Sequence, residues 1–263
     1  MRISDHAFGR FQAFIHQAAG ISLSPAKKML VAGRLSKRLR VHRLDSYDAY
    51  FELLAGGGAA DEVQTAIDLL TTNETYFFRE PRHFEVLREV AAQRVGAPLR
   101  AWSAAASSGE EAYSIAMVLA DVAGSAPWEV LGTDISQRVL ERARRAHYTM
   151  ERARHIPPAY LKRFCLKGLD EQEGTLLVDR ALRQRVNFVH ANLNAPLPQL
   201  GSFDIVFLRN VMIYFDRETK RRVVERVAAQ IKPGGTLCIG HSETLNDVSD
   251  ALKQLAPSIY RKP

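Results

Sequence analysis

The stretch from Trp102 to Ser114 constrains the fold more than any other part of this chain, because it combines three local signals in order. An apolar run predicts a buried strand, a turn of small residues follows it, and a helix then begins with Glu110 and Glu111. In α/β proteins this junction is a common place for a cofactor. A pyrophosphate would bind the free N–H groups at the start of the helix, but the two carboxylates would repel it. The turn also has only Gly109 where the dinucleotide fingerprint requires three glycines.

These features favour a cofactor with positive charge and no phosphate at this point. S-adenosylmethionine, which carries an ammonium, a sulfonium and ribose hydroxyls, is the obvious candidate. A second interpretation needs no ligand, because Ser108 and Glu111 have the spacing of a capping box. The motif alone does not separate the two interpretations. It also leaves open whether Glu110 or Glu111 would face the cofactor, since only the residue nearer the cleft can.

The rest of the chain beyond residue 96 alternates between strand-like and helix-like segments. Strands are predicted at 99–104, 129–133, 186–189, 203–208, 236–239 and 258–261, and helices near 110–122, 136–146, 158–165 and 217–231, the last ended by Pro233-Gly234-Gly235. Such alternation predicts an α/β fold with a doubly wound parallel sheet.

The chain divides into three predicted parts. Apolar residues at helical spacing predict a small all-helical domain at 1–70, a linker with a helix occupies 71–95, and the α/β domain covers 96–263. Within the last part, turn signals and a short apolar run interrupt the alternation at 166–185 and predict a small inserted β-subdomain.

Ligands of doubly wound sheets lie outside the carboxyl ends of the strands, so polar residues at these ends are candidates for a site. Besides the turn before Glu111, Asp134 ends a strand and could accept both ribose hydroxyls, although an Asp here is also a common helix cap. Asn192 and Leu193 could hold the edge and the face of an adenine. Arg209 follows a buried strand directly, where an arginine costs desolvation unless it faces a cleft or an anion.

The charge of the chain is unevenly placed. The net charge is +7, and the first 43 residues contain nine Lys/Arg against one acid, Asp5. In a predicted helix from Lys27 to Arg43, the side chains of Lys27, Arg34 and Arg38 share a narrow face. A solvated basic face is the ordinary explanation, but the scarcity of acids nearby favours a surface for an acidic partner.

Composition narrows the class of protein. With 46% hydrophobic and 25% charged residues, the chain is typical of soluble globular proteins. No apolar stretch approaches the length of a membrane span and the first residues lack a signal-peptide core, so we expect a cytoplasmic protein. Cys165 and Cys238 lie far apart, which indicates neither a disulfide framework nor a metal site. We expect a monomer by default.

Four motifs stand out in order along the chain. They are Thr72-Asn73-x-Thr75-x-Phe77-Phe78-Arg79-Glu80, the segment Trp102–Ser114, the segment Arg209–Asp216, and Gly240-His241-Ser242-Glu243. Together they strongly resemble the chemotaxis protein-glutamate O-methyltransferases, the CheR family. The resemblance implies a class I S-adenosylmethionine-dependent methyltransferase domain that methylates glutamates on the cytoplasmic helices of chemoreceptors. The chain departs from the family at Ala112, where a proline usually follows the paired glutamates.

The resemblance also implies roles for individual residues. The cofactor contacts would be Asn73, Thr75, Arg79, Glu111, Asp134, Asn192, Leu193, Leu208 and Arg209. Arg79 and Tyr214 would lie nearest the transferred methyl group. Our own hypothesis is that they position the carboxylates, one of the cofactor and one of the substrate, while Arg209 supports the cofactor side.

The predicted partner is the cytoplasmic domain of a chemoreceptor. The basic face of Lys27, Arg34 and Arg38 would dock a receptor helix rich in Glu. The inserted β-subdomain could also hold a receptor's C-terminal peptide, a property in which members of the family differ.

Other functions stay open at this point. A noncatalytic module could bind S-adenosylmethionine or its product and signal through the helical domain. A nucleic-acid methyltransferase would suit the basic helix, but no aromatic residues for base stacking are interleaved with the charges between Lys27 and Arg43, so we expect no nucleic-acid partner. A nicotinamide dehydrogenase is disfavoured by the carboxylates at the phosphate position.

Overall fold

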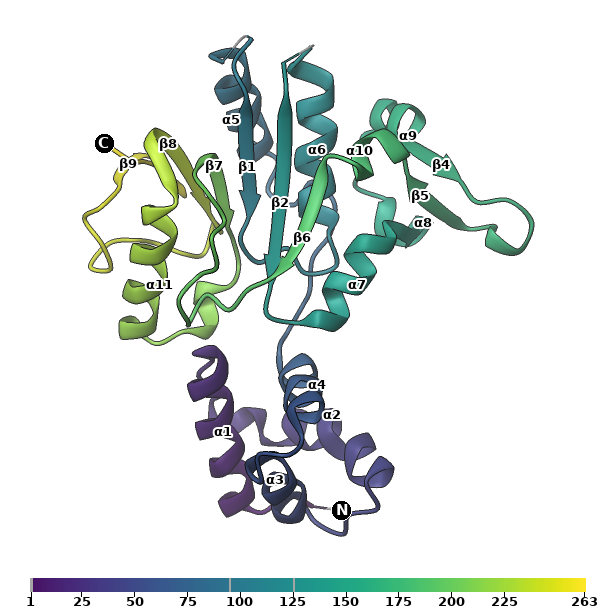
Figure 1. The fold of residues 1–263 in the computed structure, drawn as a ribbon, viewed down its shortest axis with the longest axis vertical. Helices are drawn as coiled ribbons and strands as arrows, with labels where there is room; N and C mark the ends of the chain where they lie inside the picture. The colour runs from purple at the N-terminus through teal and green to yellow at the C-terminus, as the bar shows by residue number, and fades with distance from the viewer. Residues whose placement is uncertain (1, 95, 125) are drawn as a thin grey trace.

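The computed structural model of the chain describes residues 2–94, 96–124 and 126–263. Its main strands are β1 (Leu99–Ser103), β2 (Trp128–Asp134), β6 (Val186–His190), β7 (Phe203–Leu208), β8 (Ile231–Ile239), β9 (Lys253–Ala256) and β10 (Ile259–Arg261). They form one sheet in the order β6-β2-β1-β7-β8-β10-β9 (Figure 1). The pairs from β6 to β8 are parallel, whereas β10 runs antiparallel to β8 and to β9. The predicted α/β sheet is confirmed, but it is mixed and not wholly parallel.

The C-terminal strands differ from the prediction in two further ways. The helix α11 (Arg217–Ala229) ends before residue 231, and β8 already begins at Ile231. Residues 233–235 stay in the strand because they pair with the end of the chain: Gly234 N donates to Lys262 O at 3.0 Å, and Lys262 N donates to Gly235 O at 2.9 Å. The strand β9 was not predicted, since its mostly exposed residues show no apolar alternation.

Helices cover both faces of the sheet. On one face lie α5 (Arg82–Ala92), α6 (Glu110–Val122) and α7 (Gln137–Arg145), and on the other lie α11 and the helical domain. In β7, Ile205 and Phe207 pack into the core between the sheet and α5, α6 and α7. Val206 and Leu208 pack into the core on the other face, with α11 and the helical domain. Burial on both faces explains why the central strands are continuous apolar runs in the sequence.

The N-terminal helical domain consists of α1 (Asp5–Ala19), α2 (Lys28–Val41), α3 (Tyr47–Ala55) and α4 (Ala60–Leu70). The helix predicted from Lys27 to Arg43 is shorter, because a 3-10 turn at Pro25–Lys27 precedes α2. The domain lies beyond the carboxyl ends of β1 and β2 (Figure 1). A bridge between Ile21 and Phe215 and a hydrogen bond from Ser22 N to Tyr214 O at 2.8 Å join it to the α/β domain.

The linker crosses from α4 to the sheet. The helix predicted within it is present in the structure as α5. Val95, the last residue of the predicted linker, lies outside the described residues. In the described parts of the chain, no helix has the length and apolar character needed to cross a membrane.

The insertion is larger than the predicted 166–185. It begins with β3 (His147–Thr149) and continues through α8 (Met150–Ala153) and α9 (Pro158–Phe164) to the strands β4 (Cys165–Lys167) and β5 (Thr175–Val178). The strands form an antiparallel sheet in the order β3-β5-β4, and α10 (Arg180–Arg183) leads back to β6. The β4–β5 hairpin projects away from the body of the protein (Figure 1). The early part was missed because a three-residue strand leaves almost no periodic signal.

Candidate functional site

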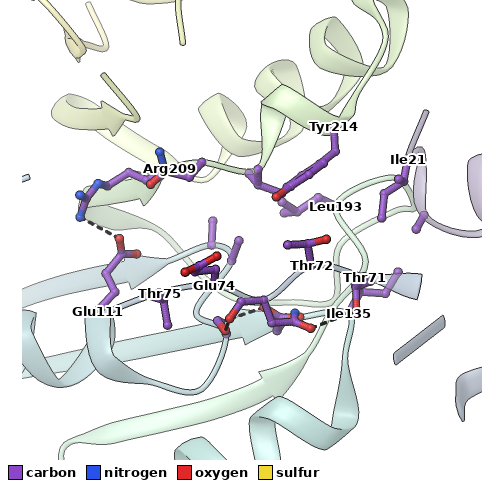
Figure 2. Close-up of a pocket in the computed structure, with 18 of the residues that line it drawn as sticks. Ile21, Thr71, Thr72, Glu74, Thr75, Glu111, Ile135, Leu193, Arg209 and Tyr214 are labelled. Atoms are coloured by element: carbon purple, nitrogen blue, oxygen red, sulfur yellow. Dashed lines mark hydrogen bonds and ion pairs between the residues drawn. The ribbon is translucent and has the colours of Figure 1, made fainter. Parts of the chain in front are cut away.

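A cavity lies between the carboxyl ends of the central strands, the linker and the helical domain, with about 830 Å³ of empty space that includes its opening to solvent (Figure 2). Nine residues predicted as site residues line it: Asn73, Thr75, Arg79, Glu111, Asp134, Asn192, Leu193, Arg209 and Tyr214. Leu208 is wholly buried in the core and is not among the residues that line the cavity, so the cofactor contact predicted at this residue stays a prediction. The helical domain contributes Ala19 and Ile21, which sequence reasoning missed because the approach of the two domains has no local signal.

The helix start settles which glutamate faces the cavity. The Glu111 carboxylate accepts from Ser103 Oγ at 2.7 Å and from Arg209 Nη1 at 2.9 Å, and it lines the cavity (Figure 2). Burial raises the pKa of Glu111, and the charge of Arg209 opposes this shift. Glu110 is 0% exposed, does not line the cavity, and accepts from Ser108 Oγ at 2.7 Å and from Arg152 Nε at 2.6 Å.

The capping-box interpretation is wrong for this helix. The N-cap of α6 is Gly109, and no side chain caps this helix. The Ser108 hydroxyl donates to the carboxylate of Glu110 and forms no capping box with Glu111. Gly109 has φ +96°, and a Cβ there would lie 2.9 Å from both Ala143 Cβ and Tyr148 Oη. A glycine is required at this position for conformation and for space.

Asp134 ends β2 and lies between two loops of the cavity wall. Its carboxylate accepts from Ser107 N and from Ser136 N, each at 2.9 Å. The residue at the N-cap of α7 is Ser136, so Asp134 is not the helix cap that the sequence left open. Burial raises the pKa of Asp134 to about 6, although the two N–H groups oppose the shift. Ser107 in turn donates its hydroxyl to Asn73 O at 2.8 Å, which ties the linker to this turn.

Arg209 is buried, with a side chain only 1% exposed. Burial of a guanidinium costs desolvation, so the sequence led us to expect an anion beside it. It lies between two carboxylates, with Nη1 2.9 Å from Glu111 Oε2 and Nη2 3.3 Å from Glu80 Oε2. Nη2 also donates to the backbone oxygen of Arg79. Glu80 is therefore a part of the site that the sequence analysis did not single out, although it stood in a quoted motif.

Arg79 and Tyr214 reach the cavity from different sides. The Arg79 guanidinium donates to Glu74 O at 3.4 Å and lies 5.6 Å from the centre of the Tyr76 ring. Tyr214 ends a short 3-10 turn at Met212–Tyr214, and its ring points into the cavity (Figure 2). The structure thus brings the two residues to one pocket.

The three cations of the predicted docking face do not form one free surface. Arg34 donates to Leu70 O, Thr71 O and Thr72 Oγ1 at 2.9, 3.2 and 3.1 Å. Arg38 is paired with the buried Glu62 of α4. Lys27 stays exposed in the 3-10 turn before α2. The spacing on one helix could not show these partners, which come from another helix and from the linker.

The sheet order, the cavity at the strand ends, and the carboxylates of Glu111 and Asp134 fit the fold of class I S-adenosylmethionine-dependent methyltransferases, which the family model matched by residues 73–260 shows. Residues 73–260 match the family model "CheR methyltransferase, SAM binding domain", and residues 6–71 match "CheR methyltransferase, all-alpha domain". The chain belongs to the CheR methyltransferase family, and the predicted family is confirmed.

Curated relatives match over nearly their whole length. The chemotaxis protein methyltransferase of Escherichia coli (strain K12) is 41% identical over 263 residues, which cover 99% of this chain and 92% of that protein. The chemotaxis protein methyltransferase of Salmonella typhimurium (strain LT2) is 40% identical over 267 residues, covering 99% of this chain and 91% of that protein.

Proposed function

We propose that the protein transfers the methyl group of S-adenosylmethionine to glutamate side chains on the cytoplasmic helices of chemoreceptors, forming glutamyl methyl esters. Membership of the CheR family supports methyl transfer in chemotaxis. The observation that carries the carboxylate as acceptor is Arg79. Its guanidinium lines the cofactor cavity, and within the described residues its one hydrogen bond goes to a backbone oxygen, not to a carboxylate.

The cavity residues fit the proposed cofactor. The buried Asp134 carboxylate can accept ribose hydroxyls, and Glu111 offers a carboxylate to the ammonium. Leu193 supplies an apolar wall for the adenine. The Asn192 amide already donates to Ala18 O at 2.6 Å and accepts from Asn194 N at 2.9 Å, so its contact would come from its backbone. Bound here, S-adenosylmethionine supplies a methyl group activated by its positively charged sulfur.

The acceptor needs little chemical activation. A glutamate side chain has a reference pKa of about 4.3, so at neutral pH it is already an anionic nucleophile and requires no general base. The protein has to remove its water and hold it in line with the methyl group at roughly 3 Å. In this proposal Arg79 neutralises one carboxylate during this step, and the Tyr214 hydroxyl donates a hydrogen bond that orients it.

Arg79→Ala tests the assignment. We expect methylation of receptor cytoplasmic fragments to fall by about 100-fold or more, because a buried carboxylate would lose its charged partner. The matched control is Arg217→Ala, an exposed arginine that donates to Asp247 O outside the cavity, which should change the rate less than about twofold. Near-normal methylation and cofactor affinity in Arg79→Ala would refute the role of Arg79.

For receptor docking we propose the exposed face of α2. Because Arg34 and Arg38 are engaged, the exposed cations of α2 without a partner among the described residues are Lys37 and Arg40. The exposed side chain of Met29 lies about two to three turns earlier on the same helix. Such a face fits an acidic amphipathic helix. Lys37→Glu and Arg40→Glu should raise the KM for receptor several-fold at low salt and leave cofactor affinity unchanged. Lys253→Glu, on β9, is the control of equal charge change, and an equal loss in that variant would exclude the docking face.

The inserted β-subdomain is the proposed place for a receptor's C-terminal peptide. β4 is an edge strand; Leu166 within it is 53% exposed, and Leu169, two residues beyond its end, is 71% exposed. An extended peptide could add a strand to it. Calorimetric titration with synthetic receptor tails tests this; binding that survives Leu166→Asp and Leu169→Asp would exclude the edge of β4. Because the receptor helices proposed as substrate lie in the cytoplasm, we also propose a cytoplasmic location for the protein.

A further inference from the structure

A cluster of polar side chains next to Arg209 does not line the cavity. It consists of Glu80 in the linker, His83 at the start of α5 and His241 in the loop after β8. The Glu80 Oε1 atom accepts from His241 N at 3.3 Å and from Asn210 Nδ2 at 3.4 Å. Its Oε2 atom faces Arg209 Nη2 at 3.3 Å, His83 Nδ1 at 3.4 Å and His241 Nε2 at 3.8 Å.

The cluster has a donor set that a metal ion could use, since one ligand atom from each of Glu80, His83 and His241 lies within 4.8 Å of the others. However, the guanidinium of Arg209 already faces the carboxylate oxygen that the ion would need. A divalent cation at this point would be repelled by a buried positive charge. The geometry therefore favours a carboxylate that holds an arginine over a metal centre.

The charges in the cluster agree with this reading. Burial raises the pKa of Glu80, but the charge of Arg209 and the His241 N–H outweigh burial and hold the pKa below its usual value, so Glu80 is an anion at neutral pH. Burial and the charge of Arg209 lower the pKa of His83 to about 3, so His83 is neutral. Glu80 is thus the anion on one side of Arg209, and Glu111 is the anion on the other.

Arg209 connects the Glu80 cluster to the backbone of Arg79. The guanidinium bonds the backbone oxygen of Arg79, and the residues on either side of Arg79 are in the left-handed region, with φ +56° at Phe78 and +57° at Glu80. Non-glycine residues adopt this conformation at a cost, so the surrounding contacts must fix it. Phe78 N donates to Ser114 Oγ at 3.0 Å, and the Glu80 carboxylate accepts from His241 N at 3.3 Å. The backbone of Arg79 is therefore fixed at three consecutive residues.

We propose that Glu80 is a positioning residue, which acts through Arg209 to keep Arg79 and Glu111 in place at the cofactor cavity. The part of this proposal that concerns Arg79 and the acceptor carboxylate rests on the proposed function. The part that concerns cofactor binding is independent of the acceptor, because Arg209 and Glu111 line the cavity themselves.

A double-mutant cycle of Glu80→Gln and Arg209→Lys tests the proposal with S-adenosylhomocysteine as the titrant in calorimetry. Each single variant should weaken binding by about tenfold. If Glu80 acts through Arg209, the double variant should bind about as weakly as Arg209→Lys alone. Effects that multiply to about 100-fold, or unchanged binding in Glu80→Gln, would overturn the proposal. Glu80→Asp, which keeps the charge, should recover part of the loss.

Two controls separate positioning from simple loss of structure. Glu62→Gln removes another buried carboxylate with an arginine partner, but in the helical domain; its effect on S-adenosylhomocysteine affinity should be small and should multiply with that of Arg209→Lys. Circular dichroism and thermal melting check that each variant is folded. Treatment of the wild type with EDTA should leave the affinity unchanged, and an EDTA-dependent loss would reassign the cluster to a metal.

Methyl transfer gives an independent readout. Glu80→Gln should lower kcat toward receptor fragments by about tenfold or more while the KM for receptor stays within about twofold. A raised KM with unchanged kcat would overturn positioning of Arg79. If the wild type binds S-adenosylhomocysteine but methylates no receptor, the proposed function fails, and the binding cycle still decides the role of Glu80.

Discussion

Residues 71–75, at the start of the linker between the helical domain and the sheet, are held at their two ends by arginines with different partners. At the first end, Arg34 of α2 donates only to neutral oxygens, those of Leu70, Thr71 and Thr72. At the second end, Arg152 of α8 donates to the buried Glu110 and, at 3.5 Å, to Thr75 O. One arginine neutralises a buried charge and the other does not. The insertion end should therefore matter more for stability, and the helical-domain end more for the shape of the cavity.

The largest expected effect is that of Arg152→Ala. Removing the guanidinium leaves the carboxylate of Glu110 buried without a charged partner, at a cost of several kcal/mol. Because Arg152 is partly exposed and the Ser108 hydroxyl remains, we expect the free energy of unfolding to fall by about 2–4 kcal/mol in urea titrations. Arg163→Ala, also in the insertion, breaks a partly exposed pair with Asp121 of α6 and should cost less than about 1 kcal/mol.

A second substitution tests the cause. In Arg152→Ala/Glu110→Gln the buried charge is gone, so the double variant should regain at least about 1 kcal/mol relative to Arg152→Ala. If it does not, Arg152 stabilises the chain by packing, and the contrast between the two ends of the segment 71–75 is not one of charge.

Arg34→Ala should have an intermediate effect. The loss of hydrogen bonds to neutral acceptors should lower the free energy of unfolding by about 1 kcal/mol. Because Thr71 and Thr72 line the cavity, the affinity for S-adenosylhomocysteine should fall by about fivefold, which calorimetry measures. Lys37→Ala, one turn further along α2 and exposed, is the control. A stability loss as large as that of Arg152→Ala, with unchanged affinity, would reverse the comparison.

The smallest effect concerns the middle of the segment 71–75, where Asn73 O accepts from Ser107 Oγ, and Ser107 N donates to Asp134. The pKa of Asp134 is about 6, and ribose hydroxyls bind best to its ionised form. Affinity should therefore be nearly full at about pH 7, fall to about half at pH 6 and continue to fall below it, by about fourfold between pH 7 and pH 5.5. Asp134→Asn should bind more weakly and lose this dependence. A flat profile in the wild type would show that Asp134 is ionised throughout.

The same comparison shows what sequence can and cannot give. The central strands were predictable because burial on both faces makes them apolar runs, and the residues at their carboxyl ends follow from the topology. The local pattern left Glu110 and Glu111 open, and only the resemblance to the CheR family named Glu111; the helix start at Gly109, in a left-handed conformation, is not marked in that pattern. The edge strand β9 gave no signal because its side chains are exposed.

Long-range pairing was the other limit. The basic face of α2 looked free in the sequence because its acid, Glu62, comes from α4, and Arg34 binds backbone oxygens, which no sequence pattern marks. The role of Glu80 likewise depends on His241, Asn210 and Arg209, which are brought to it only by the fold. Residues at strand ends can be predicted; the partners that orient them cannot.

The central claim, methyl-ester formation on receptor glutamates, is tested most directly by the chemistry of the product. Receptor cytoplasmic fragments are incubated with the protein and tritiated S-adenosylmethionine, and the labelled receptor is then treated with mild alkali. The account predicts that the label is released as volatile methanol, and that replacement of the labelled glutamates by Ala abolishes incorporation. Label that resists alkali, or the absence of label on receptors despite cofactor binding, would contradict it.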